Sequence, residues 1–354
     1  MFVYVGTYTI PPDGKASGIE IYRFDEQTGS LEYVDTKIGV ANPSFLAVHP
    51  SGDRLYAGER YLYAISEDQE GTATAYSRDP RTGALTLINH QSSHGVGPCY
   101  VSVDRTGRYV LGANYNSGSI AVLPIRADGG LDEAVSRISH SGSSIVVERQ
   151  SEPHAHMIAP TPDGRAVLVA DLGTDEIVIY HIDDNGSLER AGAIAVDAGA
   201  GPRHFAFSPD GSSLYLLNEL NSTLIAYDYD ADHLAFLHRQ TISTLPEGFT
   251  GENWPAQVVV SADGQFVYAS NRRHDTIAIF AVGDDRHLTQ VAVTPTGGKE
   301  PRNFNISPDG NWLIAANQHS DTLVVFRRDQ QTGLLHQHSD LIPSATPVCV
   351  VFAG

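Results

Sequence analysis

One pattern of apolar and polar positions recurs along the chain. It consists of an apolar strand, a tight polar turn, a second apolar strand, a short polar loop and a third strand, and it occurs six times. Apolar side chains alternate within the strands, as at 205–207 and 224–227, whereas helical periodicity is essentially missing. Each tight turn places Gly or Asp where a hairpin needs unusual backbone angles. The six turns are Pro50-Ser51-Gly52-Asp53, Asp104-Arg105-Thr106-Gly107, Pro162-Asp163-Gly164, Pro209-Asp210-Gly211, Ala262-Asp263-Gly264 and Pro308-Asp309-Gly310.

The length of this repeat indicates the architecture. The turn glycines at 107, 164, 211, 264 and 310 lie about 45 to 57 residues apart, close to the roughly 40 to 50 residues of a four-stranded propeller blade. A second turn follows the third strand in most units, as at 183–188 with the pattern Asp-x-x-Gly-x-Leu and, in shortened form, at 128–131. This second turn predicts a fourth strand in each unit.

The two ends of the chain complete the ring. Residues 1–34 supply strands with a Gly-x-Leu turn at Gly29, and residues 347–352 supply one lone strand. A strand from one terminus that joins a blade begun at the other removes the open edge that invites aggregation. No linker or shift in composition marks a second domain. We therefore predict an all-β fold, a single seven-bladed β-propeller domain over residues 1–354, with four antiparallel strands per blade and the N- and C-terminal strands in one blade.

Composition narrows the possible partners. A net charge of -19, with lysine only at positions 15, 37 and 299, argues against a surface that binds nucleic acid. No apolar run approaches the roughly 18 residues of a membrane span, and the first residues lack the features of a signal peptide. The two cysteines, Cys99 and Cys349, cannot form a disulfide framework. We expect a cytoplasmic protein without a nucleic-acid or membrane partner, either a monomer or a homodimer.

The unusual polar residues gather on one face of the predicted propeller. In a four-stranded blade, the segment before strand one and the loop from strand two to strand three share a face, opposite the Pro-Asp-Gly turns. Since strand one is innermost, we expect His156, Arg203 and Arg302 near the axis, with Glu219 close behind Arg203 in the same blade. The other polar residues of these segments that we predict to bind substrate are His154, His204, Asn114 and Asn303.

Such a cluster suits the hydrolysis of a lactone. A His or Glu side chain can accept a proton from the attacking water, and guanidinium groups can stabilise the oxyanion or hold a phosphate or carboxylate. The sequence has no phosphate-binding Gly loop and no CxxC or HExxH spacing, and His154-Ala155-His156 has no third ligand nearby. We therefore expect neither a cofactor nor a metal. Structural roles stay open: Arg203 and Glu219 could form an ion pair between adjacent strands, and the histidines could cap turns.

Three segments carry a resemblance to a known family. Residues 199–204 (Gly-Ala-Gly-Pro-Arg-His), 208–211 and 217–222 closely resemble the fourth-blade region of the propeller-type 6-phosphogluconolactonases, the lactonase family. Similarity extends along the whole chain, with further matches at 3–9, 112–118 and 301–305. The resemblance implies hydrolysis of an anionic lactone, 6-phospho-D-glucono-1,5-lactone, in the oxidative pentose phosphate route, without metal or nucleotide.

The resemblance also leaves two alternatives. The family is similar to fungal carboxymuconate cyclases, for which a His, two Arg and a Glu around the channel have been proposed as the active site. These would fall on His156, Arg203, Glu219 and Arg302, with His156 preferred to His154 because it keeps the family's distance to the following Pro-Asp turn. A non-catalytic propeller that binds sugars, acids or a protein is the other alternative, although the loops are polar and rich in arginine.

Overall fold

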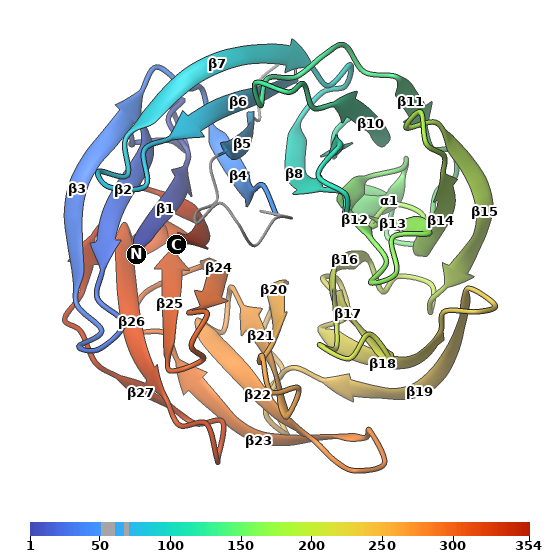
Figure 1. The fold of residues 1–354 in the computed structure, drawn as a ribbon. Coiled ribbons are helices and arrows are strands. Elements are labelled where there is room, and N and C mark those ends of the chain that lie inside the picture. The colour runs from blue at the N-terminus through green and yellow to red at the C-terminus, as the bar shows by residue number, and fades with distance from the viewer. Residues whose placement is uncertain (51–60, 67–70) are drawn as a thin grey trace.

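Seven antiparallel sheets radiate around a central axis in the computed structural model (Figure 1), which describes residues 1–50, 61–66 and 71–354. The first blade contains β4 (Pro43–Val48), β5 (Tyr61–Ser66), β6 (Thr72–Arg78) and β7 (Leu85–Ser92). The second contains β8 (Pro98–Val103), β9 (Tyr109–Asn114), β10 (Ser119–Pro124) and β11 (Ser136–Ser139). The third contains β12 (Ala155–Pro160), β13 (Ala166–Asp171), β14 (Glu176–Ile182) and β15 (Leu188–Ala195).

The remaining four blades repeat this order from the axis outwards. The fourth contains β16 (Pro202–Phe207), β17 (Ser213–Asn218), β18 (Thr223–Asp230) and β19 (Ala235–Ser243). The fifth contains β20 (Pro255–Val260), β21 (Phe266–Asn271), β22 (Thr276–Val282) and β23 (Leu288–Pro295). The sixth contains β24 (Pro301–Ile306), β25 (Trp312–Asn317), β26 (Thr322–Arg328) and β27 (Leu335–Gln337), and β28 (Ile342–Pro343) also pairs with β26. The seventh contains β29 (Pro347–Ala353), β1 (Phe2–Thr7), β2 (Gly18–Phe24) and β3 (Leu31–Ile38).

The ring closes as the sequence predicts. The C-terminal strand β29 pairs antiparallel with the N-terminal strand β1, with Phe2 opposite Ala353 and Val5 opposite Val350. The seven-bladed propeller and its closing blade are therefore confirmed. Of the predicted turns, Pro50-Ser51-Gly52-Asp53 lies almost entirely outside the described residues.

Apolar packing between neighbouring sheets holds the blades together. The second strand of each blade lies between two sheets, so strands such as β13 and β25 are buried along their whole length. The outermost strands, such as β15, alternate between exposed and partly buried positions. At one junction the turn glycine Gly29 (φ 72°) lies against the ring of Trp312, where a Cβ atom would come within 2.4 Å of the ring. The indole N–H of Trp312 donates to the carbonyl of Glu26 at 2.8 Å, so this turn is fitted to the neighbouring blade.

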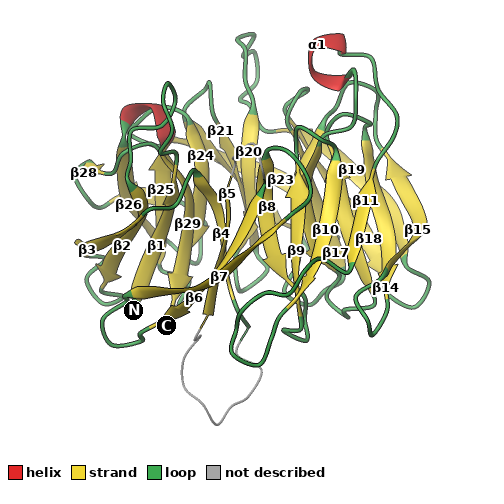
Figure 2. Cartoon of the chain, turned by 90° about the horizontal axis from the view of Figure 1, so that it is seen from above, coloured by secondary structure: helices red, strands yellow, loops and turns green. Residues whose placement is uncertain are grey.

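Helical structure is confined to two short segments within the described ranges. They are α1 (Val147–Gln150), between β11 and β12, and a 3₁₀ turn (Gln318–Ser320) after β25. Figure 2 shows both on the same rim of the propeller. In the described residues no helix is long and apolar enough to cross a membrane.

Candidate active site

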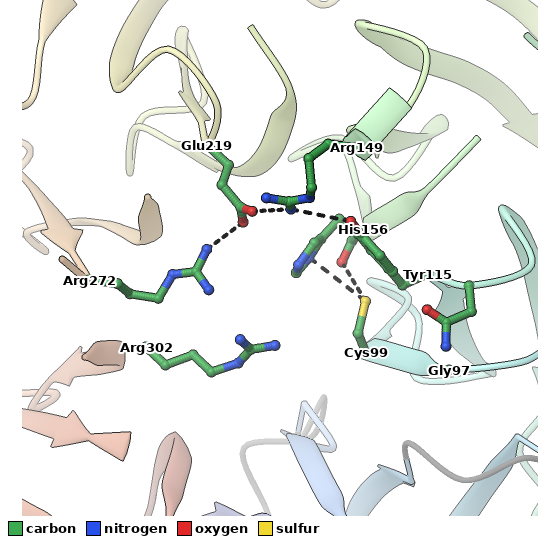
Figure 3. Close-up of a pocket in the computed structure, with 9 residues that line it drawn as sticks. Gly97, Cys99, Tyr115, Arg149, His156, Glu219, Arg272 and Arg302 are labelled. Atoms are coloured by element: carbon green, nitrogen blue, oxygen red, sulfur yellow. Dashed lines mark hydrogen bonds and ion pairs between the residues drawn. The ribbon is translucent and has the colours of Figure 1, made fainter. Parts of the chain in front are cut away.

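A cavity of about 270 Å³ opens on the rim that carries α1. Its walls come from the second to the sixth blade, and all of them belong to the face predicted from the sequence to hold the unusual polar residues. Figure 3 shows the side chains converging from several blades. The lining residues are Gly97, Cys99, Tyr115, Asn116, Arg149, His156, Glu219, Arg272 and Arg302.

A β-bulge directs side chains from every innermost strand to the axis. In each blade the pairing of strand one with strand two shifts register just after the first residue of strand one, which is a proline in six of the seven strands. Bulges re-aim side chains. We call the second residues of the innermost strands the inner ring: Ser44, Cys99, His156, Arg203, Ala256, Arg302 and Val348. Three of the predicted catalytic residues belong to this ring.

A second set of residues follows the second strand of the blades, further from the axis. We call it the outer ring, and in the described part of the chain it comprises Tyr8, Tyr115, Leu172, Glu219, Arg272 and Gln318. Tyr115, Glu219 and Arg272 line the cavity, and the guanidinium of Arg302 lies 5.5 Å from the ring centre of Tyr8. The repeat therefore presents two concentric sets of side chains at the mouth.

Glu219 is the centre of a buried cluster of arginines. Its Oε2 atom accepts a hydrogen bond from Nε of Arg203 at 2.8 Å, and its Oε1 atom accepts one from Nη2 of Arg149. Nη2 of Arg272 lies 2.7 Å from Oε2, an ion pair in which the N–H groups are out of line for a hydrogen bond. Burial alone would raise the pKa of Glu219, but Arg272, Arg203 and Arg149 lower it to about 2. The carboxylate is therefore ionised at neutral pH.

His156 lies in the same cavity and is 5% exposed. Its Nδ1 atom is 3.8 Å from Sγ of Cys99, and its ring packs edge-on to the rings of Tyr115 and His204. Burial and then the charge of Arg203 hold the pKa of His156 well below 6.5. The imidazole is thus neutral at pH 7 and has a nitrogen able to accept a proton.

A narrower cavity continues from the first one along the innermost strands. It has a volume of about 10 Å³, which is about the room that one water molecule needs. It shares Cys99, His156 and Arg302 with the larger cavity and adds three more residues of the inner ring and three that follow an inner-ring residue in its strand. These are Ser44, Phe45, Arg203, His204, Asn303 and Val348. The larger cavity therefore has a floor, and Arg203 lies in that floor.

The structure brings together the four predicted catalytic residues. His156, Glu219 and Arg302 line the larger cavity, and Arg203 lies beneath them, bonded to Glu219 and to the carbonyl of Ala256.

The four predicted substrate-binding residues lie in different places. His204 is 3% exposed in the floor, and its Nδ1 atom lies 2.7 Å from Oε1 of Gln257. Asn303 also lines the floor, and its Oδ1 atom accepts a hydrogen bond from the backbone N–H of Val350 at 2.9 Å. His154 stacks on Tyr115 at 4.4 Å between ring centres and does not line either cavity.

Asn114 lies away from both cavities. It is fully buried, its Oδ1 atom accepts a hydrogen bond from the hydroxyl of Ser93 at 2.7 Å, and its Nδ2 atom donates to the hydroxyl of Ser119 at 3.1 Å. These contacts tie the end of β9 to β10 and to the connection that leads into β8. The position of Asn114 gives no support to a role in binding substrate.

Several residues of the site are not among those predicted from the sequence. Arg149 reaches the cavity from α1, and Arg272 reaches it from the loop between β21 and β22. Tyr115, whose hydroxyl accepts a hydrogen bond from Nη2 of Arg149 at 3.3 Å, and Cys99 complete the set. Tyr115 and Arg272 occupy the blade position of Glu219, so alignment of the repeats would have found them. Arg149 has no counterpart in the repeat.

The two histidines of the His154-Ala155-His156 segment have different surroundings. His156 lies in the bulge of β12 and lines the cavity, whereas His154 lies before the strand, where its backbone N–H donates to Oδ1 of Asp171 at 2.8 Å. Among the residues described, no group of three His, Cys, Asp or Glu side chains is placed to hold a metal ion.

Comparisons with known proteins identify the family. The model of a family described as "Lactonase, 7-bladed beta-propeller" matches residues 2–352. A 6-phosphogluconolactonase of Bacillus subtilis is 37% identical over 350 residues, which are 99% of this chain and 97% of the relative. Among solved structures, a periplasmic gluconolactonase of Pseudomonas aeruginosa is 33% identical with a TM-score of 0.92, covering 100% of this chain and 99% of that one. A Bacteroides fragilis protein is 35% identical with a TM-score of 0.90, covering 99% and 97%. The resemblance predicted from the sequence is confirmed, and the chain belongs to the lactonase family of seven-bladed β-propellers.

Proposed function

We propose that this protein hydrolyses 6-phospho-D-glucono-1,5-lactone, and that it does so without a metal ion. The observation that carries the proposal is a neutral, buried His156 in a cavity that Arg272 and Arg302 also line. An imidazole and guanidinium groups supply a proton acceptor and an anion-binding environment in one enclosed site. The name of the Bacillus subtilis relative supports the choice of lactone.

His156 is a better candidate for the general base than Glu219. With a pKa of about 2 and with both carboxylate oxygens in contact with guanidinium groups, Glu219 is a weak proton acceptor. Figure 3 shows Glu219 between Arg149 and Arg272, with His156 beside the open space. We assign Glu219 the role of a positioning residue that fixes these guanidinium groups.

In the proposed reaction, His156 first accepts a proton from water and later donates it to the ring oxygen of the lactone. A water molecule gives a proton to His156 while its oxygen attacks the lactone carbonyl carbon, and Arg302 stabilises the oxyanion that forms. When the tetrahedral intermediate collapses, the bond from that carbon to the ring oxygen breaks. The proton on His156 then passes to the ring oxygen, which leaves as a hydroxyl group, and the carbonyl carbon becomes a carboxylic acid that ionises in solution.

The charge of the substrate assists this base. Positive charge on Arg203 and Arg302 contributes to the low pKa of His156. A bound phosphate or carboxylate offsets part of that charge and raises the pKa of the imidazole towards neutrality, where general bases are most effective. An anionic lactone should therefore raise the pKa of His156 when it binds, and an uncharged lactone should raise it less.

The test is the hydrolysis of freshly generated 6-phosphogluconolactone by the purified protein against the spontaneous rate. We expect clear acceleration that His156→Gln reduces about 100-fold or more, the usual contribution of a general base. His181→Gln is the matched control, because His181 is exposed on β14. Equal rates with and without protein would exclude this function, and full activity in His156→Gln would exclude His156 as the base.

The same assay separates the alternatives. A lactonising cyclase would act on carboxymuconate and leave the phosphorylated lactone unchanged, and a non-catalytic propeller would act on neither. We further propose a place in the oxidative pentose phosphate route, a cytoplasmic location and a monomer or homodimer. Cell fractionation tests the location, since the Pseudomonas aeruginosa relative is described as periplasmic.

A further inference from the structure

On the rim above the cavity, two arginines of the Glu219 cluster and one further arginine surround Trp254. The guanidinium groups of Arg149, Arg272 and Arg273 lie 5.8, 5.8 and 4.4 Å from the centre of its indole ring. Each of these contacts is within the range of a cation–π interaction, which fixes the cations on the aromatic face. Trp254 is partly exposed, just before β20, so the cluster lies at the opening of the cavity.

Glu219 has two guanidinium partners besides Arg149. Arg203 and Arg272 already contact Oε2 of Glu219, and both are buried. Arg149 is 30% exposed and makes its hydrogen bonds within the described residues through Nη2 alone. Its Nε and Nη1 groups are thus available as donors, and a guanidinium with free donors holds a phosphate or carboxylate in bidentate fashion.

One further cation of this group has no carboxylate partner. Arg273 is exposed and forms no ion pair within the part of the chain that the structure describes. Arg272, by contrast, is held by Glu219, with Nη2 2.7 Å from Oε2. An anion bound at the mouth would accept hydrogen bonds from Arg273.

Side-chain hydrogen bonds hold in place the short helix that carries Arg149. The adjacent Gln150 is fully buried, and its Nε2 group donates to the carbonyl of Leu172 and to Oδ1 of Asp175, both at 2.8 Å. Asp175 in turn accepts hydrogen bonds from the backbone N–H groups of Gly199 and Gly201. The short helix α1 is therefore pinned to the segment that leads into β16, and the position of Arg149 is preorganised.

Tyr115 links this rim cluster to the proposed base. Its ring packs edge-on to His156, with 5.4 Å between the ring centres, while its hydroxyl contacts Arg149. One tyrosine side chain thus contacts both His156 and Arg149. The floor accommodates no more than a water, so the room for a substrate lies between the floor and the rim.

We propose that Arg149, Arg273 and Trp254 form an outer subsite that binds the remote phosphate of the substrate, while the lactone carbonyl points towards His156 and Arg302. This inference rests on the function proposed above and adds the direction in which the substrate binds. Arg149 and Arg273 then decide specificity for a phosphorylated over an unphosphorylated lactone. The phosphate remains at the hydrated mouth, and only the reacting carbonyl enters the enclosed end.

Steady-state kinetics with two substrates test the subsite. For the phosphorylated lactone we expect Arg149→Gln to raise KM about tenfold or more, as the loss of a hydrogen bond to a charged group does, with kcat changed by less than about threefold. For unphosphorylated glucono-1,5-lactone the rise in KM should be smaller, because this substrate has no phosphate for Arg149 to bind. Arg273→Gln should act in the same sense but more weakly, and Arg149→Lys should restore part of the loss.

The control and the contrary outcomes are equally specific. Arg105→Gln, in the turn between β8 and β9 on the opposite face, should match the wild type with both substrates. An equal loss of kcat/KM with both lactones would show that Arg149 acts only through Glu219, and unchanged kinetics would remove Arg149 from the subsite. Either result overturns the proposal.

A binding experiment separates this inference from the proposed activity. The chain has two tryptophans, and Trp312 is 5% exposed, so a fluorescence change on ligand binding at the mouth reports on Trp254. We expect 6-phosphogluconate to bind at least tenfold more tightly than gluconate, and Arg149→Gln to abolish the difference. Equal affinities in the wild type would refute the subsite even if the lactone is hydrolysed. A preference for 6-phosphogluconate in a protein without lactonase activity would support the subsite while the proposed function failed.

Discussion

Replacing Glu219 by glutamine removes the only carboxylate that, in the described residues, contacts three of the site's arginines at once. In the folded protein these interactions lower the pKa of Glu219 from 4.5 to about 2, which corresponds to about 3 kcal/mol of stabilisation at neutral pH. Removing one partner of a buried ion pair typically costs about 3 to 5 kcal/mol, because the remaining charge stays buried without compensation. We expect Glu219→Gln to lower the free energy of unfolding by about 3 kcal/mol.

The pH dependence of this loss has a definite sign. Since the pKa of Glu219 is lower in the folded than in the unfolded protein, its stabilisation is present above about pH 4.5 and disappears as the pH falls towards 2. The difference between wild type and variant should therefore be largest at neutral pH and shrink in acid. Urea unfolding followed by circular dichroism at pH 7 and at pH 3 to 4 measures both values.

A matched substitution separates this effect from the loss of any surface charge. Glu176 pairs with Arg190 at 3.1 Å, but the side chains are 36% and 58% exposed, so Glu176→Gln should change the free energy of unfolding by less than about 1 kcal/mol. If Glu219→Gln were no more destabilising than Glu176→Gln, or if its effect did not shrink in acid, the carboxylate would not be compensating the buried arginines. The role of Glu219 as a positioning residue would then be wrong.

Two further changes follow from the same geometry. Because the pKa values of His156 and His204 are held well below 6.5 by burial and then by Arg203, the unfolded chain binds more protons below that pH, and the free energy of unfolding should fall as the pH decreases from about 6.5. Urea midpoints at pH 8 and pH 5 measure this fall, and His156→Gln should reduce it; an equal fall in both proteins would contradict the assignment. Asn303→Ala should lower the free energy of unfolding by about 1 to 3 kcal/mol, since it leaves the buried N–H of Val350, in the closing blade, without its side-chain acceptor. Asn185→Ala, in an exposed turn, is its control, and equal unfolding curves for the two variants would show that this hydrogen bond contributes little.

The fold was predictable because its signals are local and repeated. The tight turns of the repeat favour hairpins by their own backbone preferences, and six such turns at the spacing of propeller blades are compatible with few architectures. Closure was predictable from the remainder of the chain, since β29 has no other partner in the repeat. The same reasoning placed Glu219 behind Arg203, because Pro202 pairs with Asn218 where β16 and β17 run side by side.

Other parts of the site depend on contacts that no local pattern encodes. Arg149 lies in the long connection between β11 and β12, whose path over the rim is fixed by the buried Gln150 and by Asp175 in another blade. Arg272 and Arg273 are adjacent in sequence, yet only Arg272 turns inwards, where its Nε group donates to the carbonyl of Trp254 at 3.0 Å. Neither the path of this connection nor the inward orientation of Arg272 follows from residue type or spacing.

The repeat itself offers a criterion that separates structural from chemical residues. Asn114, Asn271 and Asn317 end the second strands of three blades, and each uses its side chain to bind the preceding connection: Nδ2 donates to the carbonyls of Ser93, Thr244 and Thr296, respectively. A residue type that recurs at the same position of several blades stabilises the blade structure, which explains why Asn114 lies outside the cavity. At the next position the residues differ, and Tyr115, Glu219 and Arg272 all line the cavity. The backbone at this position is the same in each of these blades. The side chains that differ there between blades are therefore the ones that can take part in chemistry. The same holds for the inner ring, where His156, Arg203 and Arg302 replace the small or apolar residues of the other blades.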